Sequence, residues 1–317
     1  MQLNRRNFLK QSATMSATAF LPSLPAFSYS PDTAPASAPA PAAADGFRLV
    51  VLATNWGFSG THDEFLKRAK DAGYDGMEVW WPGDAAGQDA LFNALAKHKM
   101  EVGFLCGSGS SDFAKHAEQF EAAVKAAATQ QRQRPLYINC HSGKDYFTFE
   151  QNTKLIEMTT RISQQSGVMV CHETHRSRMM FAAHVTRRFI ETQPALRLTL
   201  DISHWCNVHE SLLQDQQETV AMALARAGHI HARIGHPEGP QVNDPRAPEW
   251  ESTVKAHFAW WDEIARQKKA KGEVMTVLTE FGPVDYMPAL PYTRQPVANQ
   301  WDINVHMMKL LKARYGK

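Results

Sequence analysis

Four apolar runs in the second half of the sequence each end near a carboxylate or an imidazole. They read VMVCHETH (168–175), LRLTLDISH (196–204), HIHAR (229–233) and VMTVLTEFG (274–282). Each has the length and apolar content of a strand buried on both faces. Their polar residues Glu173, Asp201, His231 and Glu280 are 28, 30 and 49 residues apart. The first two intervals each match one strand followed by one helix, and the third contains a long loop.

The same alternation extends over the chain from residue 47. Apolar runs predict eight strands, at 49–54, 77–81, 102–106, 136–141, 168–173, 196–201, 229–234 and 274–280. Helix-like spacing of apolar residues predicts helices between them, at 63–72, 88–98, 111–129, 149–166, 179–192, 211–226, 250–268 and 297–314. Strict alternation requires parallel strands with crossover helices, and eight such units predict a (β/α)8 TIM barrel. An open doubly wound sheet is disfavoured because no glycine-rich turn follows the first strand.

The composition is that of a globular protein and argues against two kinds of partner. Of the 317 residues, 44% are hydrophobic and 21% are charged, and the formal net charge is +2. No basic stripe is present to neutralise phosphates, so we expect no nucleic-acid partner. No run of about 18 apolar residues occurs, so we expect no stable membrane anchor in the mature protein.

The first 45 residues predict export. The segment NRRNFLK (4–10) precedes a weakly apolar run and resembles a twin-arginine signal, with a plausible cleavage site at Ala26-Phe27-Ser28. Residues 29–45 are mostly Ala, Pro and Ser, as in a semi-stiff linker. We therefore expect a signal peptide at 1–28, a linker at 29–45 and the barrel at 46–317. The expected partner during export is the twin-arginine translocase, and the expected location is periplasmic.

The cysteines fit a protein that folds before export. Cys106, Cys140, Cys171 and Cys206 each lie in or just after an apolar run, and no two are close in sequence. We expect buried free thiols. One or two disulfides formed in the periplasm are the alternative.

Three carboxylates and an imidazole at one barrel mouth predict a metal site. In such barrels the functional groups stand at the carboxyl ends of the strands, so the four side chains should converge. Carboxylates that converge repel one another unless a cation neutralises them. The mixed oxygen and nitrogen ligands suit one divalent ion, with Mn²⁺ expected and Mg²⁺, Co²⁺ or Zn²⁺ as alternatives. For each acid taken singly, the competing interpretation is a cap on the following helix.

These segments together resemble a known family. CHETH (171–175), LDISH (200–204), HIH (229–231) and TEFG (279–282) are similar to the xylose-isomerase-like barrels, over most of residues 47–315. More narrowly, they resemble the sugar (phosphate) isomerase and epimerase group. The resemblance implies that Glu173, Asp201, His231 and Glu280 bind one divalent metal ion. It also implies that Glu173 and Glu280 are the acid/base pair and that His204 contacts the substrate.

The chain departs from the epimerases of that group after His231. They carry an arginine about six residues after the metal-binding histidine, and here that arginine is missing. We expect Arg233 and His236 to take over substrate contact, unless the substrate differs from a simple ketohexose. Further candidates for substrate binding at the strand ends are His141, Lys144, Glu78, Trp56 and His175. The competing interpretations are structural hydrogen bonds for His141 and Lys144, and core packing for the tryptophans Trp56, Trp80 and Trp81.

The predicted activity is that of a sugar isomerase or epimerase. A proton next to a carbonyl becomes removable when a metal stabilises the developing enediolate and a carboxylate accepts the proton. No Arg and Lys cluster marks a phosphate pocket, so we expect a small neutral sugar or keto-sugar as substrate. The alternatives are a lyase acting on a keto-cyclitol or 3-keto-glycoside, and a non-catalytic sugar-binding barrel. A DNA-repair endonuclease shares the fold but needs more metal-binding histidines, and the sequence leaves a homo-oligomer open.

Overall fold

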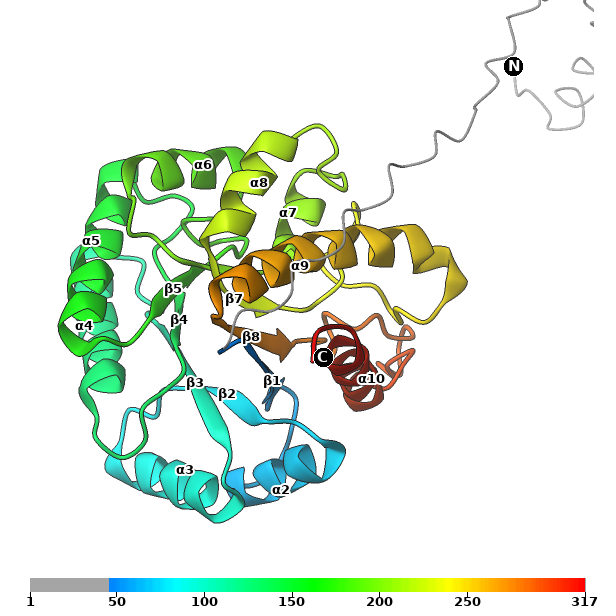
Figure 1. The fold of residues 1–317 in the computed structure, drawn as a ribbon, viewed down its shortest axis with the longest axis horizontal. Coiled ribbons are helices and arrows are strands. Elements are labelled where there is room, and N and C mark those ends of the chain that lie inside the picture. Colours follow the sequence, from blue (N-terminus) through cyan, green and yellow to red (C-terminus); the bar gives the residue numbers. More distant parts are fainter. Residues whose placement is uncertain (1–45, 317) are drawn as a thin grey trace, which may run out of the picture. The chain divides into compact units, whose positions relative to one another are not determined.

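A closed barrel of eight parallel strands confirms the predicted (β/α)8 architecture. The computed structural model describes residues 46–316, so the predicted signal peptide and linker lie outside the described residues. Each strand pairs with the next in sequence, and β8 closes on β1 (Figure 1). The strands are β1 (Arg48–Thr54), β2 (Gly76–Trp80), β3 (Glu101–Gly107), β4 (Ile138–His141), β5 (Val170–Glu173), β6 (Leu198–Leu200), β7 (Ala227–His231) and β8 (Val274–Thr279).

Helices connect successive strands and surround the barrel (Figure 1). Because every strand runs in the same direction, each connection must return across the outside of the sheet. The helices are α2 (His62–Ala72), α3 (Ala85–His98), α4 (Phe113–Thr129), α5 (Phe149–Ser166), α6 (Ala183–Thr192), α7 (Ile202–Val208), α8 (Gln217–Arg226), α9 (Glu251–Lys271) and α10 (Gln300–Tyr315), with a short 3₁₀ turn η1 (Pro248–Trp250) before α9.

Local sequence fixes the ends of several helices. At the start of α2, Thr61 accepts the N–H of Glu64, and the Glu64 side chain accepts the N–H of Thr61, which forms a capping box. The helix ends at Gly73, whose φ of 102° lies in the left-handed region that glycine adopts without strain. The start of α5 repeats the capping box with Thr148 and Gln151.

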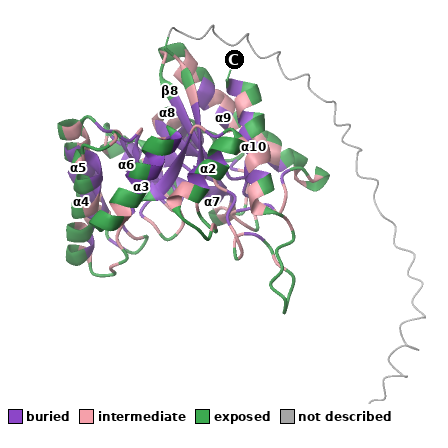
Figure 2. Cartoon of the chain, turned by 90° about the horizontal axis from the view of Figure 1, so that it is seen from below, coloured by how far each residue is buried: buried purple, intermediate pink, exposed green. Residues whose placement is uncertain are grey.

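The core has two parts. The larger lies between the strands and the surrounding helices, and alternate strand residues such as Val51 and Val277 belong to it. The smaller, inside the barrel, consists of Val50, Leu52, Leu278 and Tyr137. Figure 2 shows the buried residues concentrated on the strands, whereas the outer faces of the helices are exposed. The apolar layer inside the barrel supports the polar residues at its mouth.

The connection after β6 differs from the prediction. Strand β6 ends at Leu200, and the short helix α7, which was not predicted, follows at once. It begins there because the Asp201 side chain accepts the N–H of Ser203 at 3.1 Å. The next helix was predicted from residue 211 but starts only at Gln217. Leu213, with φ of 59°, interrupts the helical path between them.

Two further expectations concern the cysteines and membrane spans. All four cysteines are buried and free, which confirms the expected thiols. Within residues 46–316, none of the helices combines the length and the apolar content that crossing a bilayer requires.

Candidate metal centre and adjoining cavity

The structure brings the four predicted ligands together at the barrel mouth. Glu173 and His231 are the last residues of β5 and β7, while Asp201 and Glu280 come directly after β6 and β8. One ligand atom from each residue lies within 4.8 Å of the others. The carboxyl ends of four neighbouring parallel strands meet at one level, so the alternation seen in the sequence is enough to assemble this quartet.

Three atoms of the quartet are buried and have no hydrogen-bond partner: Glu173 Oε1, His231 Nδ1 and Glu280 Oε2. His231 Nδ1 lies 2.9 Å from Glu280 Oε2 and 3.7 Å from Glu173 Oε1. Buried polar atoms normally have partners, so unpaired atoms that face one another indicate a place for a shared cation. Three carboxylates and one imidazole fit a divalent ion such as Mn²⁺ or Mg²⁺.

Arg233 links two of the carboxylates to His204. Its side chain is 1% exposed. Nη2 donates to Asp201 Oδ2 and, at 2.7 Å, to His204 Nε2, while Nη1 lies 3.6 Å from Glu280 Oε2. Nε donates to Ser203 Oγ at 3.2 Å. Arg233 was expected to contact the substrate, and it does border the cavity. Most of its donors are nevertheless directed at the protein, where the guanidinium partly neutralises the quartet.

A further carboxylate lies behind His231. Nε2 of His231 is 3.2 Å from Glu78 Oε1 and 3.1 Å from Asn139 Nδ2. Asn139 also donates to Glu173 Oε2 at 2.8 Å. Glu78 is 4% exposed, and its other oxygen lies 3.6 Å from His229 Nε2. Glu78 was expected to bind substrate; it lines the cavity, and its carboxylate also contacts His231, a proposed metal ligand. Such a carboxylate orients the imidazole and fixes its tautomer.

The charges in the quartet shift the pKa values of its members in opposite directions. Burial alone would raise the pKa of Glu173, but His141 and His231 outweigh it and hold that pKa well below its usual range. Burial also opposes a charge on His231, yet the carboxylates of Glu280, Glu173 and Glu78 raise its pKa well above the usual value. Without a cation, His231 therefore keeps a proton that a metal ion would displace.

Burial is the main cause of the pKa shifts of Asp201, a member of the quartet, and of His175 and His204 beside it. Burial raises the pKa of Asp201 to about 7, against the opposing charge of Arg233. Burial lowers the pKa of His175 to about 4, although Glu173 favours its charged form. His204 is fully buried, and its pKa is well below the usual value for the same reason. Both histidines are therefore neutral at pH 7. The lone pair of His204 accepts the hydrogen bond from Arg233, whereas that of His175 is available to a ligand.

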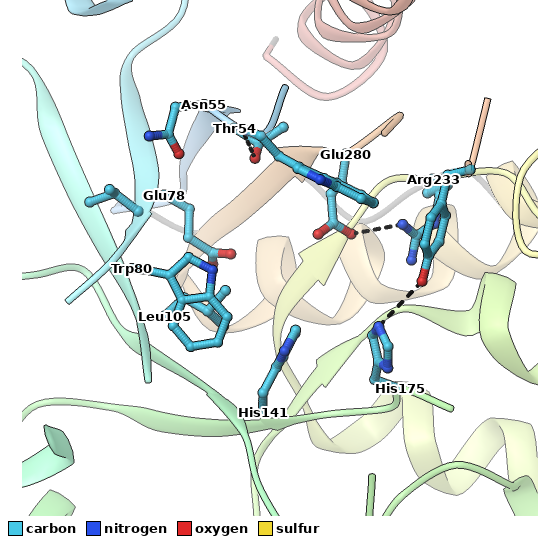
Figure 3. Close-up of a pocket in the computed structure, with 12 residues that line it drawn as sticks. Thr54, Asn55, Glu78, Trp80, Leu105, His141, His175, Arg233 and Glu280 are labelled. Carbon is cyan, nitrogen blue, oxygen red and sulfur yellow. Dashed lines mark hydrogen bonds and ion pairs between the residues drawn. The ribbon is translucent and has the colours of Figure 1, made fainter. Parts of the chain in front are cut away.

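A cavity of about 220 Å³ opens beside the quartet. Aromatic side chains form part of its wall: Trp56 packs edge-on against Tyr286 at 4.9 Å, and Trp80 packs edge-on against His141 at 5.4 Å. Trp56 is 38% exposed and Trp80 is 51% exposed. Figure 3 shows polar side chains from several strand ends directed at the same space, namely Thr54, Asn55, Glu78, His141, His175, Arg233 and Glu280.

Five of the eight predicted substrate-binding residues line this cavity, and three do not. His204 lies behind His175, with ring centroids 4.0 Å apart, and is fully buried. His236 lies outside the cavity lining, and its ring packs on Trp250 at 4.8 Å. Lys144 also lies outside the cavity lining. Its backbone carbonyl oxygen accepts a hydrogen bond from the Asn152 side chain. The five that line it are Glu78, Trp56, His141, His175 and Arg233.

Several residues at the site were not predicted from the sequence, among them Thr54 and Asn55 in the cavity lining, and Asn139 and Tyr286. Asn139 stands two positions before His141 in β4, so strand alternation places both on the same face and would have found it. Tyr286 lies in the irregular loop after β8, where no periodic pattern exists. Its hydroxyl is 3.5 Å from His175 Nε2, and its ring lies under the Arg233 guanidinium at 4.7 Å.

The chain belongs to the xylose isomerase-like TIM barrel family, whose model matches residues 66–248. Solved structures that share the fold include the following three. A 3-keto-D-glucoside 4-epimerase from E. coli is 13% identical over 84% of this chain and 100% of its own, with a TM-score of 0.56. A probable 3-DHS dehydratase of petrobactin synthesis from Bacillus anthracis is 17% identical over 83% and 98%, with a TM-score of 0.51.

The third structure is a xylose isomerase-like TIM barrel protein from Mycobacterium smegmatis in complex with magnesium. It is 9% identical over 83% of this chain and 97% of its own, with a TM-score of 0.56. At these identities the likeness shows a common fold. No curated protein sequence matches the chain.

Proposed function

We propose that the protein is a divalent-metal-dependent sugar isomerase or epimerase that abstracts a proton next to a carbonyl. The observation that carries the proposal is the quartet of Glu173, Asp201, His231 and Glu280, three of whose members hold a buried atom without a hydrogen-bond partner. Two structures that share the fold support the assignment: one is a 3-keto-D-glucoside 4-epimerase, and the other is a protein in complex with magnesium. Mn²⁺ is the expected ion, since it accepts mixed carboxylate and imidazole ligands.

The quartet would hold the ion, and the side chains of Glu280, Glu173 and His141 would transfer the proton. A bound divalent ion provides Lewis-acid stabilisation for the negative charge that develops on the substrate oxygens. Glu280 borders the cavity and is positioned to accept or return a proton there. Glu173 is fully covered, but its Oε2 lies 2.8 Å from Nε2 of His141, which does border the cavity. His141 would therefore carry protons between Glu173 and the substrate.

The cavity wall favours a neutral sugar. Trp56 and Trp80 offer aromatic faces to the C–H surfaces of a sugar ring, and His175 offers a neutral ring nitrogen to a hydroxyl. Among the residues that line the cavity, the only Arg or Lys is Arg233, and its guanidinium already interacts with Asp201 and Glu280. A phosphate group would therefore lack a free cationic partner in this cavity.

A lyase is the second candidate. The position six residues after His231, where the group's epimerases have an arginine, is Pro237 in this chain. A fold neighbour is described as a dehydratase, which supports elimination as a reaction of such barrels. If a leaving oxygen is β to the carbanion, the same acid and base would expel it. Release of a neutral product from a keto-cyclitol or a 3-keto-glycoside would favour this candidate.

Export through the twin-arginine translocase to the periplasm is a separate part of the proposal. It is supported by Arg5-Arg6, the apolar run that follows, and the Ala/Pro-rich residues 29–45. The double variant Arg5→Lys, Arg6→Lys should leave the protein in the cytoplasm upon cell fractionation. Equal periplasmic recovery of both forms would exclude this route.

Solvent exchange tests the reaction. The full chain loaded with Mn²⁺ is incubated with ketohexoses and 3-keto-glycosides in D₂O, and NMR follows deuterium at carbons next to the carbonyl. We expect incorporation that requires the metal and is lost in Glu280→Gln but persists in Glu249→Gln, a change at an exposed site. Exchange that continues at an equal rate in Glu280→Gln would remove that residue from the proton transfer.

A further inference from the structure

The loop between β8 and α10 carries a hairpin on the mouth side of the barrel. Residues 288–297, which we call the hairpin, include an antiparallel bridge between Ala289 and Pro296. The N–H of Leu290 donates to the carbonyl oxygen of Gln295 at 2.8 Å, so backbone hydrogen bonds join the two arms. In Figure 2 an exposed loop extends away from the barrel at this position. The hairpin is therefore held in shape by its own backbone, while its outer part is in contact with solvent.

The tip of the hairpin is apolar and exposed. Tyr292 is completely exposed, and Leu290 and Val297 are 49% and 46% exposed. The backbone of Tyr292 has a φ of 63°, in the left-handed region that is unfavourable for a side chain of this size. Single exposed apolar residues are common on monomers, but three of them on one ordered projection mark an interaction surface.

An open groove lies at the base of the same hairpin. Its volume is about 570 Å³, larger than the 220 Å³ of the cavity at the barrel mouth. Residues of the hairpin and of the flanking loop line it, most of them apolar: Pro283, Val284, Met287, Pro296 and Ala298. An apolar projection and an apolar groove that is large enough for an aromatic ring are therefore parts of one continuous surface.

The charge of this surface favours a second copy of the chain as the partner. Between residues 283 and 300 the only charged residues are Asp285 and Arg294, which form an ion pair with each other. The surface is neutral, so two copies can meet without the repulsion that a patch of one sign would cause, and the pair is its own complement across a two-fold axis. A hairpin that inserts into an anionic lipid surface would carry several basic residues.

We propose that the protein forms a two-fold symmetric dimer in which each hairpin inserts its tip into the groove of the second copy. The two hairpins are antiparallel in this arrangement, so Tyr292 of each copy reaches the groove at the base of the other. The same surface serves on both sides, as a two-fold interface requires. The proposal goes beyond the proposed function and does not depend on it.

The exposed surface is sufficient for such a dimer. A stable interface buries about 800 Å² per partner, and one fully exposed aromatic side chain supplies about 150–250 Å² of this area. Leu290, Val297 and the walls of the groove would supply the remainder. The same loop carries Tyr286, which lines the cavity at the barrel mouth, so the dimer would also hold that part of the cavity wall in place.

Sedimentation velocity of the full chain tests the proposal. Over about 1–100 μM chain, we expect a species of twice the 35.5 kDa of one chain. Tyr292→Ser should raise the Kd of the dimer at least about 30-fold, because an aromatic anchor at the centre of an interface carries much of its affinity. Tyr146→Ser is the matched control, since Tyr146 is also exposed but lies between β4 and α5, and this variant should dimerise like the wild type.

A mixing experiment tests the reciprocal insertion. Gln295→Arg places a bulky charge in the groove wall, at an exposed residue, and should also weaken the dimer. In an equimolar mixture with Tyr292→Ser, the intact tyrosine of one variant can enter the unaltered groove of the other, which restores one of the two contacts. Native mass spectrometry should therefore detect more mixed dimer than dimer of either variant alone.

Three results would overturn the proposal: a wild type that is monomeric over the whole concentration range, a dimer as stable in Tyr292→Ser as in Tyr146→Ser, or a mixture without a preferred mixed dimer. Circular dichroism checks that each variant is folded. If Gln295→Arg is unfolded, the comparison of Tyr292→Ser with Tyr146→Ser decides alone.

Discussion

Glu78 Oε1 lies 3.2 Å from Nε2 of His231, while Nδ1 of the same ring faces Glu280 at 2.9 Å. The Glu78 carboxylate therefore favours a proton on Nε2 of His231 and leaves the Nδ1 lone pair for a cation.

We expect Glu78→Gln to weaken Mn²⁺ binding by about 10–100-fold, as measured by calorimetry. Glu249→Gln is the control, because that carboxylate is exposed. Equal affinities in the two variants would show that Glu78 does not influence His231.

Removal of Arg233 should destabilise the metal-free protein strongly. Arg233→Met leaves Asp201 buried without its ion-pair partner, at an expected cost of about 3–5 kcal/mol in the free energy of unfolding. Bound Mn²⁺ should restore part of this, since it neutralises the same carboxylate. Urea unfolding with and without Mn²⁺ measures both effects. Arg246→Met removes a partly exposed ion pair with Asp244 and should cost less than about 1 kcal/mol. If Arg233→Met lowered the free energy of unfolding as little as Arg246→Met does, Arg233 would not stabilise the buried charge of Asp201.

The loop glycine Gly282 allows Trp56 to form the cavity wall. A Cβ at this position would be 2.4 Å from two atoms of the Trp56 ring. Gly282→Ala should therefore displace the indole and raise KM for any sugar that packs on it, several-fold, with little change in Mn²⁺ affinity. Gly109→Ala is the matched control, because nothing lies within 4 Å of the added Cβ. If both variants show the wild-type KM, Trp56 does not contact the substrate.

Buried neutral histidines should make stability depend on pH. His257 in α9 accepts the N–H of Gly235 at 3.2 Å, and burial lowers its pKa to about 4. The unfolded chain takes up a proton near its ordinary pKa of about 6.5, so the free energy of unfolding falls as pH drops from about 6.5 toward 4.

The full contribution of His257 is about 3 kcal/mol, present above pH 6.5 and lost at the lower end. His172, with its pKa lowered to about 3, acts in the same direction. Urea unfolding at a series of pH values should show a shallower slope in His257→Gln than in the wild type. A parallel profile would mean that His257 does not titrate differently on unfolding.

The architecture and the quartet were accessible from the sequence because both depend on local patterns. Buried parallel strands are continuous apolar runs, and the residue that ends such a run stands at the barrel mouth. Glu173, Asp201, His231 and Glu280 could therefore be named before their distances were known. The helices after β6 were predicted incorrectly. The Asp201 side chain caps the start of α7, and the left-handed backbone at Leu213 separates α7 from α8, and neither feature follows from the spacing of apolar residues.

The surroundings of the quartet were less accessible because they depend on side-chain direction and loop path. Nothing in the spacing shows that Arg233 turns toward Asp201 and His204. His204 was expected to contact substrate. In the structure it is completely buried behind the cavity wall, where its Nε2 accepts a hydrogen bond from Arg233. Tyr286 comes from an irregular loop, whose course is set by tertiary packing and leaves no periodic signal.

Binding of one divalent ion by the quartet is the central claim, and elemental analysis tests it most directly. The full chain and its Asp201→Ala variant are incubated with Mn²⁺, dialysed and measured for metal per folded chain. The account predicts about one Mn²⁺ per wild-type chain and none in the variant. No retained metal in either protein, or equal amounts in both, would contradict it and favour a sugar-binding barrel without metal chemistry.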